Sequence, residues 1–166
     1  IHSRTTKQIY QGFARHDIIR DIGRRMTVPL IISGDIFSVD QAKAALEITG
    51  ATAVMVARGG LGRPRLVEQL HRYFLDGTRL PDATLQEQLV YLRRYAKQLV
   101  ALKGEDVAIR ELRGIGVHFL TGYPGVKPFK AAMTTMASFD ELDTIIHRAR
   151  LKIRAEKRHE DKKITV

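Results

Sequence analysis

The chain has 166 residues, of which 44% are hydrophobic and 28% are charged, and it carries a formal net charge of +10. No apolar run approaches the roughly 20 residues that span a bilayer, so we expect a cytoplasmic protein with no membrane partner. The sequence contains no cysteine, which excludes disulfides, zinc–thiolate sites and a cysteine nucleophile within these residues. The basic excess favours a polyanionic partner, nucleic acid before a membrane, over a merely basic surface.

The chain starts without a methionine or a leader peptide, and we expect it to be part of a longer protein. Residues 1–5 have the composition of a strand that leads into a loop. A helical pattern follows over residues 15–25, with Ile18, Ile19 and Ile22 on its apolar side. These segments together form the first expected βα unit.

A second unit consists of an apolar strand over residues 28–32 and a helix that ends near Gly50. Ser38 and Gln41 have the spacing of a capping box at the start of this helix. Residues 53–57 form a third strand that is apolar throughout, as expected for a strand buried on both faces.

The third strand leads into Ala57-Arg58-Gly59-Gly60-Leu61-Gly62-Arg63-Pro64 and a helix predicted over residues 64–75. Glycines allow backbone N–H groups to approach an anion closely, and the following helix adds the positive end of its dipole. Arg58 can add a bidentate charged fork. This turn alone fits a phosphate cradle and an ordinary βα turn with a surface arginine about equally.

Strand and helix thus alternate three times, which predicts a parallel sheet with helices packed outside it. Three strands cannot close a barrel, so either preceding strands or a second copy of the chain must cover the open edge. In a (β/α)8 TIM barrel the active site lies at the C-terminal ends of the strands. The pattern therefore predicts an α/β fold followed by an all-α part, and the family resemblance given below implies that the α/β part is a partial TIM barrel.

The second half of the chain has helical signals only, after a turn-rich linker over residues 76–82. Thr84 and Glu87 form another capping box, followed by a helix to about residue 102. Its apolar stripe consists of Leu85, Leu89, Leu92, Ala96 and Leu99. Further helices are expected over residues 106–120, 128–136 and 138–157. The predicted division is a barrel portion at 1–77, a helical domain at 78–158 and a frayed tail at 159–166.

Residues 78–158 contain 15 Lys or Arg against 9 Asp or Glu, a net charge of +6. A bundle with basic faces can follow a phosphate backbone, although for any single side chain a solvated surface is the simpler interpretation. The candidate RNA contacts are Arg93, Arg94, Lys97, Arg110, Arg113, Arg148, Arg150, Lys152 and Arg154.

Five motifs occur in order along the chain: His2-Ser3-Arg4-Thr5, Tyr10-Gln11-Gly12, Ser33-Gly34-Asp35-Ile36, Ala57 through Arg65, and Glu111-Leu112-Arg113 through Gly122-Tyr123-Pro124-Gly125. Together they resemble the tRNA-dihydrouridine synthase family over nearly the whole chain. The corresponding family patterns are His-Gly-Arg-Thr, Tyr-x-Gly, Asn-Gly-Asp-Ile, Gly-Arg-Gly-Ala-Leu-Gly-Asn-Pro-Trp and a helix before Gly-x-Pro-Gly.

The resemblance implies the last βα units of a TIM barrel that holds FMN, followed by a helical domain that grips tRNA. It implies reduction of the C5–C6 double bond of uridine in tRNA, with hydride from the flavin and NADPH as the electron source. In the family a general-acid cysteine and a lysine near the flavin lie in the first half of the barrel. We therefore expect no catalytic residue in this stretch, no metal, and no activity of the chain alone.

By resemblance, the cofactor would contact His2, Ser33, Gly34, Asp35, Ala57 and Arg58. His2 would lie beside the isoalloxazine ring, with a structural histidine as the alternative. Asp35 would orient backbone N–H groups, as carboxylates do in turns, and Arg58 would bind phosphate. Arg4 would either stand near the RNA entrance or brace a loop.

The sequence departs from the family pattern at several positions. Ser33 replaces an asparagine, Ala57 a glycine, Arg65 a tryptophan, and Gly114-Ile115 a Lys-His pair aimed at RNA. Two alternatives therefore stay open beside the synthase. One is another FMN- or phosphate-binding barrel oxidoreductase, and the other is a non-catalytic RNA-binding module that uses the half barrel as a scaffold.

Overall fold

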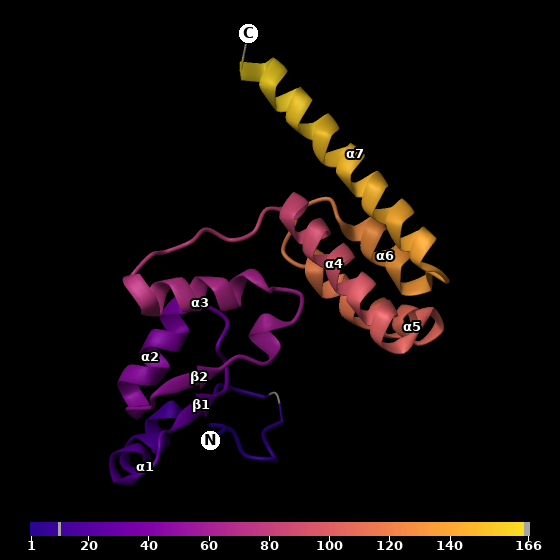
Figure 1. Cartoon of the computed structure of the whole chain (residues 1–166). Helices are drawn as coiled ribbons and strands as arrows, with labels where there is room; N and C mark the ends of the chain where they lie inside the picture. The colour runs from indigo at the N-terminus through magenta and orange to yellow at the C-terminus, as the bar shows by residue number, and fades with distance from the viewer. Residues whose placement is uncertain (10, 165–166) are drawn as a thin grey trace. The chain divides into compact units, whose positions relative to one another are not determined.

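The computed structural model describes residues 1–9 and 11–164, without the side chains of residues 157 and 159–164. Tyr10 of the second motif and residues 165–166 of the expected tail thus lie outside the described residues. The chain divides into two compact units, Ile1–Asp82 and Ala83–Val166 (Figure 1). In the described part of the chain, no helix has both the length and the apolar character needed to cross a membrane.

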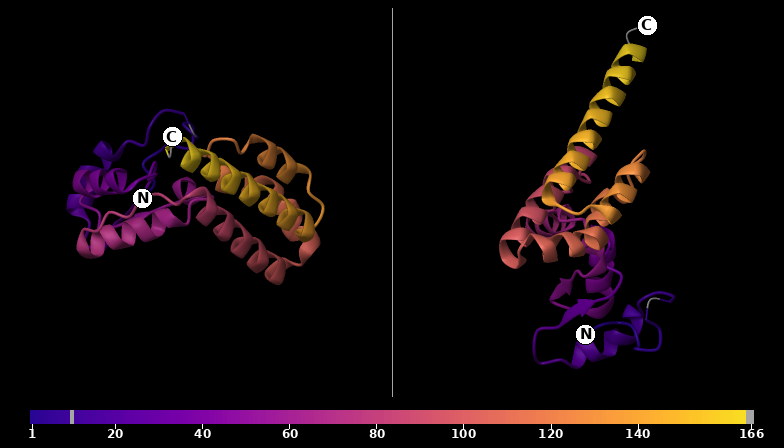
Figure 2. Two further views of the ribbon diagram at one scale, coloured as in Figure 1. Left: turned by 90° about the horizontal axis from the view of Figure 1, so that it is seen from above. Right: turned by 90° about the vertical axis from the view of Figure 1, so that its right-hand side faces the viewer.

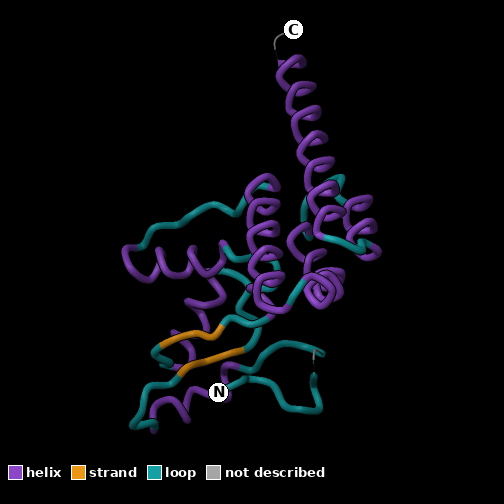
Figure 3. Tube along the Cα trace, turned by 45° about the vertical axis from the view of Figure 1, so that its right-hand side comes forward, coloured by secondary structure: helices purple, strands orange, loops and turns teal. Residues whose placement is uncertain are grey.

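The first unit contains helices and a small parallel sheet, drawn in orange in Figure 3. Its elements are η1 (His16–Ile19), α1 (Arg20–Arg25), β1 (Ile31–Ser33), α2 (Val39–Thr49), β2 (Ala53–Met55), η2 (Arg58–Gly60) and α3 (Arg65–Asp76). β1 and β2 pair in parallel, with Ile32 opposite Val54. The expected strand over residues 1–5 is reduced to a single parallel bridge between His2 and Ser33. The predicted strand–helix alternation is therefore present, with shorter strands than expected.

The sheet is buried on one face only. Ile32 and Val54 point to the face covered by α2, and Ile32 is completely buried in the core of the unit. Ile31 and Met55 point to the opposite face, where they are 47% and 57% exposed. The prediction that the third strand is buried on both faces is therefore wrong for this chain. Successive side chains of a strand alternate between faces, and packing of α2 can bury only one of them.

The first helical segment also differs from the prediction. It begins as the 3₁₀ turn η1 and continues as α1, and of its three apolar candidates only Ile19 is buried. Ile18 and Ile22 are 55% and 38% exposed. The change from 3₁₀ to α geometry alters the angular spacing of the side chains, so the expected apolar side does not form one buried stripe.

The predicted caps of α2 are present, but one hydrogen bond of the capping box has a different partner from the one expected. Ser38 Oγ accepts from the Gln41 N–H at 3.2 Å, while Gln41 Oε1 accepts from the Phe37 N–H rather than from that of Ser38. Gly50 ends the helix in the left-handed region at φ 67°. Such caps satisfy backbone groups that the helix itself leaves unpaired.

The linker after α3 is attached to the first unit, which continues past the expected boundary at residue 77. Gln69 Nε2 donates to the Leu80 carbonyl at 3.0 Å and to Asp82 Oδ1 at 3.1 Å. Arg79 pairs with Asp40 of α2 at 2.6 Å. These contacts tie the linker to the two helices that precede it.

The second unit contains helices joined by short turns, and no strand occurs among its described residues. Its elements are α4 (Leu85–Lys103), α5 (Glu105–Ile115), η3 (Gly116–Leu120), α6 (Lys127–Thr135) and α7 (Phe139–Ile164). The capping box of Thr84 and Glu87 is confirmed, and the predicted stripe of α4 packs into the core. α7 continues beyond residue 157, into the segment expected to fray, and Figure 2 shows it extending past the other helices of this unit. Ile153 is the last described α7 residue packed against the core.

Candidate functional site

The carboxyl ends of β1 and β2 meet at one edge of the sheet because the two strands are parallel. A cavity of about 30 Å³ opens there, with room for roughly one or two water-sized groups. The residues expected to contact the cofactor all line it: His2, Ser33, Gly34, Asp35, Ala57 and Arg58. The structure thus brings together three segments that are separated in the sequence.

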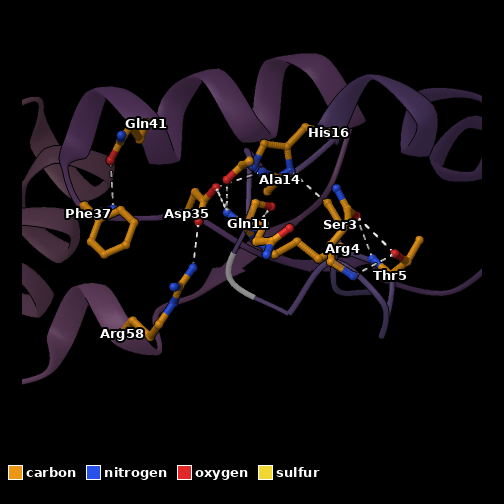
Figure 4. A network of polar contacts seen from close by, with 12 residues as sticks. Ser3, Arg4, Thr5, Gln11, Ala14, His16, Asp35, Phe37, Gln41 and Arg58 are labelled. Atoms are coloured by element: carbon orange, nitrogen blue, oxygen red, sulfur yellow. Dashed lines mark hydrogen bonds and ion pairs between the residues drawn. The ribbon is translucent and has the colours of Figure 1, made fainter.

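Asp35 is the centre of a network of polar contacts at this cavity (Figure 4). Its Oδ2 accepts from Arg4 Nη2 at 2.6 Å and from the Ala14 backbone N–H at 2.7 Å. Its Oδ1 accepts from Arg58 Nη2 at 2.9 Å. One carboxylate therefore joins the start of the chain, the loop after β1 and the loop after β2.

The backbone at this point is folded for that role. Asp35 adopts φ 51°, in the left-handed region that aspartate tolerates better than most residues, and the preceding Gly34 has φ 121°. A Cβ on Gly34 would lie 2.9 Å from the Ala14 side chain. Gly34 thus allows the loop after β1 to pass close to the loop that contains Ala14, and Asp35 turns its carboxylate toward Ala14.

Arg4 braces a loop, which is one of the two roles considered for it. Its side chain is only 4% exposed. Nη1 and Nη2 donate to the carbonyls of Gln11 and Gly12, each at 2.8 Å, in addition to the contact with Asp35. The guanidinium therefore closes the loop between the first bridge and η1.

Asp35, Arg4 and Arg58 form a trio of charged side chains whose electrostatics favour an ionised Asp35. Burial alone would raise the pKa of Asp35, but the Ala14 N–H and the charges of Arg4 and Arg58 outweigh it, so the pKa lies below its ordinary value. One negative and two positive charges leave the group with a net positive charge. Because Arg58 is 41% exposed, it is the member of the trio that an incoming anion can reach.

Gly59 has a packing role that the phosphate interpretation of the glycine-rich turn did not include. A Cβ at Gly59 would overlap the Ile36 backbone carbonyl, and the residue itself is buried. Arg63 Nη1 also donates to the Phe37 carbonyl at 3.0 Å, and Phe37 lies under the Arg58 guanidinium at 5.8 Å. The loops after β1 and β2 are thus held in direct contact beside the cavity.

His2 and Ser33 contribute to the same wall through their pairing. Their backbones form the bridge next to β1, with the Ser3 N–H donating to the Ser33 carbonyl at 3.1 Å. The His2 ring lies 3.5 Å from the position that a Cβ on Gly34 would occupy. The bridge therefore places the exposed His2 side chain at the cavity.

In the helical unit, Arg93 is held by an ion pair. Its Nε and Nη2 donate to the two carboxylate oxygens of Asp143, each at 2.7 Å, which joins α4 to α7. Hydrogen bonding by Arg93 is the main cause that holds the pKa of Asp143 below its ordinary value, with help from Lys97 and Arg150. Much of the Arg93 charge is therefore balanced inside the unit.

Two further candidates donate to backbone carbonyls. Arg113 Nε donates to the Met136 carbonyl at 2.8 Å, and Lys152 Nζ donates to the Gly125 carbonyl at 2.9 Å. The remaining candidates are exposed or half-buried: Arg94, Lys97, Arg110, Arg148, Arg150 and Arg154. These six basic side chains are the better candidates for contacts with a polyanion.

The sequence interpretation missed the partners of its own candidates. Asp143 lies fifty positions from Arg93, and Ala14 contributes only a backbone N–H to Asp35. Neither has a local sequence signal. Gly59 did have one, because the glycines at positions 59, 60 and 62 suggest close backbone approach, but the sequence does not show whether a ligand or a neighbouring loop makes that approach.

Comparison with known proteins identifies the family. Residues 1–157 match the family described as Dihydrouridine synthase (Dus). The "Probable tRNA-dihydrouridine synthase" of Mycobacterium leprae is 34% identical over 149 residues, covering 89% of this chain and 39% of the relative. The "Probable tRNA-dihydrouridine synthase 1" of Synechocystis sp. is 33% identical over 155 residues, covering 91% and 43%. The "tRNA-dihydrouridine synthase B" of Pseudomonas aeruginosa is 29% identical over 140 residues, covering 84% and 42%.

The similarity runs through both units of the chain, since the family match extends from the first bridge into α7. The chain spans about two fifths of the length of these curated relatives. The resemblance in the five short motifs and the match over residues 1–157 agree, and the chain belongs to the dihydrouridine synthase family.

Proposed function

We propose that this chain forms the C-terminal part of an FMN-dependent tRNA-dihydrouridine synthase. Residues 1–77 would supply part of the cofactor-binding barrel, and residues 78–158 would supply helices that bind tRNA. The observation that carries the proposal is the cavity at the ends of two parallel strands, lined by all six expected cofactor contacts in a chain of this family. The net charge of +10 supports a polyanionic substrate.

The half-exposed sheet supports the proposed partial (β/α)8 barrel. Ile31 and Met55 lie on the face opposite α2, and in a closed barrel that face is the packed interior. The curated relatives are longer than this chain, so the remainder of a longer protein would supply the strands that cover these side chains. The cavity would then lie at the C-terminal end of the completed barrel.

The residues present fit the phosphate of FMN. The Arg58 guanidinium lines the cavity, offers donors in a fixed fork and is accessible to an incoming anion. Asp35 is an acid near a proposed phosphate, but Arg4 and Arg58 more than balance its charge. The cavity is too small for the whole cofactor, so the residues that line it would hold only part of FMN.

Bound FMN would supply the hydride that reduces the uridine C5–C6 double bond, with NADPH as the electron source. This chain's residues would bind and orient: Arg58 would hold the phosphate, Asp35 would fix the direction of Arg58, and Gly59 would keep the two site loops together. The sequence has no cysteine to act as the general acid that the family uses. We therefore expect the chain alone to form no dihydrouridine on tRNA.

The experiment that tests the cradle is an FMN titration of the chain, followed by flavin fluorescence. Arg58→Ala should weaken FMN binding roughly ten- to a hundredfold, because a charge-assisted contact to phosphate is lost. Arg72→Ala is the matched control, since Arg72 is a similarly exposed arginine paired with Asp76 on α3, away from the cavity. Equal FMN affinities for wild type and Arg58→Ala, or no binding to the wild-type chain, would contradict the proposed cradle.

A further inference from the structure

A second concave site lies within the helical unit, between η3 and α6. It is an open groove of about 600 Å³, and it contains none of the RNA contacts expected from the sequence. Apolar side chains form most of its wall, and two lysines of α6 belong to its lining. The residues that matter for the argument are Val117, Leu120, Tyr123, Lys127, Lys130 and Ala131.

The charge around this groove favours an anion. Among the described residues, no Asp or Glu lines it. Lys130 Nζ donates to Thr121 Oγ1 at 3.1 Å, which holds one amine next to the turn, and Lys127 is exposed at the start of α6. No acid occupies the first turn of α6, so the positive end of the helix dipole adds to both amines. Glu156 Oε1 lies 3.7 Å from the position of a Cβ on Gly125, at one edge of the groove, and it pairs with Lys152 Nζ at 3.6 Å. The two lysines of α6 are therefore left to stabilise an anionic group in the groove.

The wall of the groove favours a flat, partly apolar group next to that anion. The Tyr123 hydroxyl donates to the Ala83 carbonyl, which fixes the position of the ring. Gly122 and Gly125, at φ 92° and 68°, leave the backbone of the turn uncovered by side chains. Proteins recognise unpaired RNA by stacking bases on aromatic rings and by hydrogen bonds to their exposed edges. A base inside a duplex cannot enter such a groove, because both of its faces are already stacked.

We propose that this groove holds one unstacked nucleotide of a bound RNA, with its base against the apolar wall and its phosphate on Lys127 and Lys130. The inference rests on the proposed function, which supplies RNA as the anionic partner. It adds to that function a single-strand site, separate from the basic helix surfaces that would follow the phosphate backbone. Binding at the groove should therefore depend on its apolar volume as well as on charge.

The test measures fluorescence anisotropy of two labelled RNAs with the whole chain: a short oligouridine and a fully paired hairpin. Ala131→Leu fills the groove without changing charge, and Ala101→Leu makes the same change at an exposed position of α4. Ala131→Leu should bind oligouridine roughly five- to a hundredfold more weakly, as expected for loss of one stacked base, and should bind the hairpin like wild type. Ala101→Leu should leave both affinities unchanged.

A second variant keeps the test decisive if Ala131→Leu does not fold. The double variant Lys127→Ala/Lys130→Ala changes two lysines outside the hydrophobic core and should make the slope of log affinity against log salt shallower by roughly 1–2 for oligouridine. An unchanged slope, or an Ala131→Leu variant that binds oligouridine like Ala101→Leu, would overturn the proposed nucleotide site in the groove. Either result would leave the proposal of RNA binding elsewhere on the chain intact. If the wild-type chain bound neither RNA at low salt, the proposed tRNA-binding role would fail together with the groove.

Discussion

Replacing Asp35 by asparagine should destabilise the first unit far more than removing Arg58. The side chain of Arg4 is 4% exposed and that of Asp35 is 17% exposed, whereas that of Arg58 is 41% exposed. Asp35→Asn therefore leaves the Arg4 cation in a buried position without its counter-charge. It also weakens the acceptor for the Ala14 N–H.

The magnitude follows from these exposures. Removing one partner of a buried ion pair costs about 3–5 kcal/mol, and because Asp35 keeps some contact with water we expect about 2–4 kcal/mol for Asp35→Asn. The pair with Arg58 is closer to a surface salt bridge, so Arg58→Ala should cost at most about 1 kcal/mol. The ratio of the two effects is the sharper prediction, since both variants act on the same carboxylate.

The pH dependence has a definite sign. The folded state holds the pKa of Asp35 below its ordinary value, so the stabilisation is fully present above the unfolded pKa of about 3.9 and is lost as the pH falls through the folded pKa. Asp35→Asn should remove this part of the acid sensitivity.

Urea unfolding followed by circular dichroism measures the free energy, and amide exchange at the Ala14 N–H reports specifically on the first unit. We expect a lower unfolding midpoint and faster Ala14 exchange in Asp35→Asn. If Asp35→Asn were no more destabilising than Arg58→Ala, and Ala14 exchange were unchanged, the carboxylate would not hold these segments together.

Two further predictions concern the helical surface and the site loops. Arg94→Ala should make the salt slope of tRNA binding shallower by up to about 1, whereas Arg93→Ala should change the slope less and lower the melting temperature more, because Arg93 is bound to Asp143. Anisotropy across a salt series and thermal circular dichroism distinguish the two variants, and identical slopes and melting temperatures would contradict the assignment. Gly59→Ala should abolish FMN binding, because its Cβ would overlap a backbone carbonyl of the neighbouring loop. Retention of FMN by this variant in a fluorescence titration would show that the contact between the loops does not support the cradle.

Local signals in the sequence were sufficient for most element boundaries. The capping box at the start of α4 involves only Thr84 and Glu87, three positions apart. Gly50 ends α2 in the left-handed backbone region, which glycine adopts without steric strain. The strand–helix alternation also follows from hydrophobic spacing within each segment. The family resemblance named the six cofactor candidates, and their positions at the ends of parallel strands predicted that they lie at one edge of the sheet.

The tertiary structure decided which charges are available and which faces are covered. Asp35 binds Arg4 and Arg58, and Arg93 binds Asp143, through contacts between segments that have no common local pattern. An arginine looks the same in the sequence whether it meets solvent, a carboxylate or a phosphate. The exposure of Met55 likewise depends on what packs against the sheet, not on the strand itself. Local structure is determined by residues within a few positions of one another, whereas burial and charge pairing are determined by which segments the fold brings together.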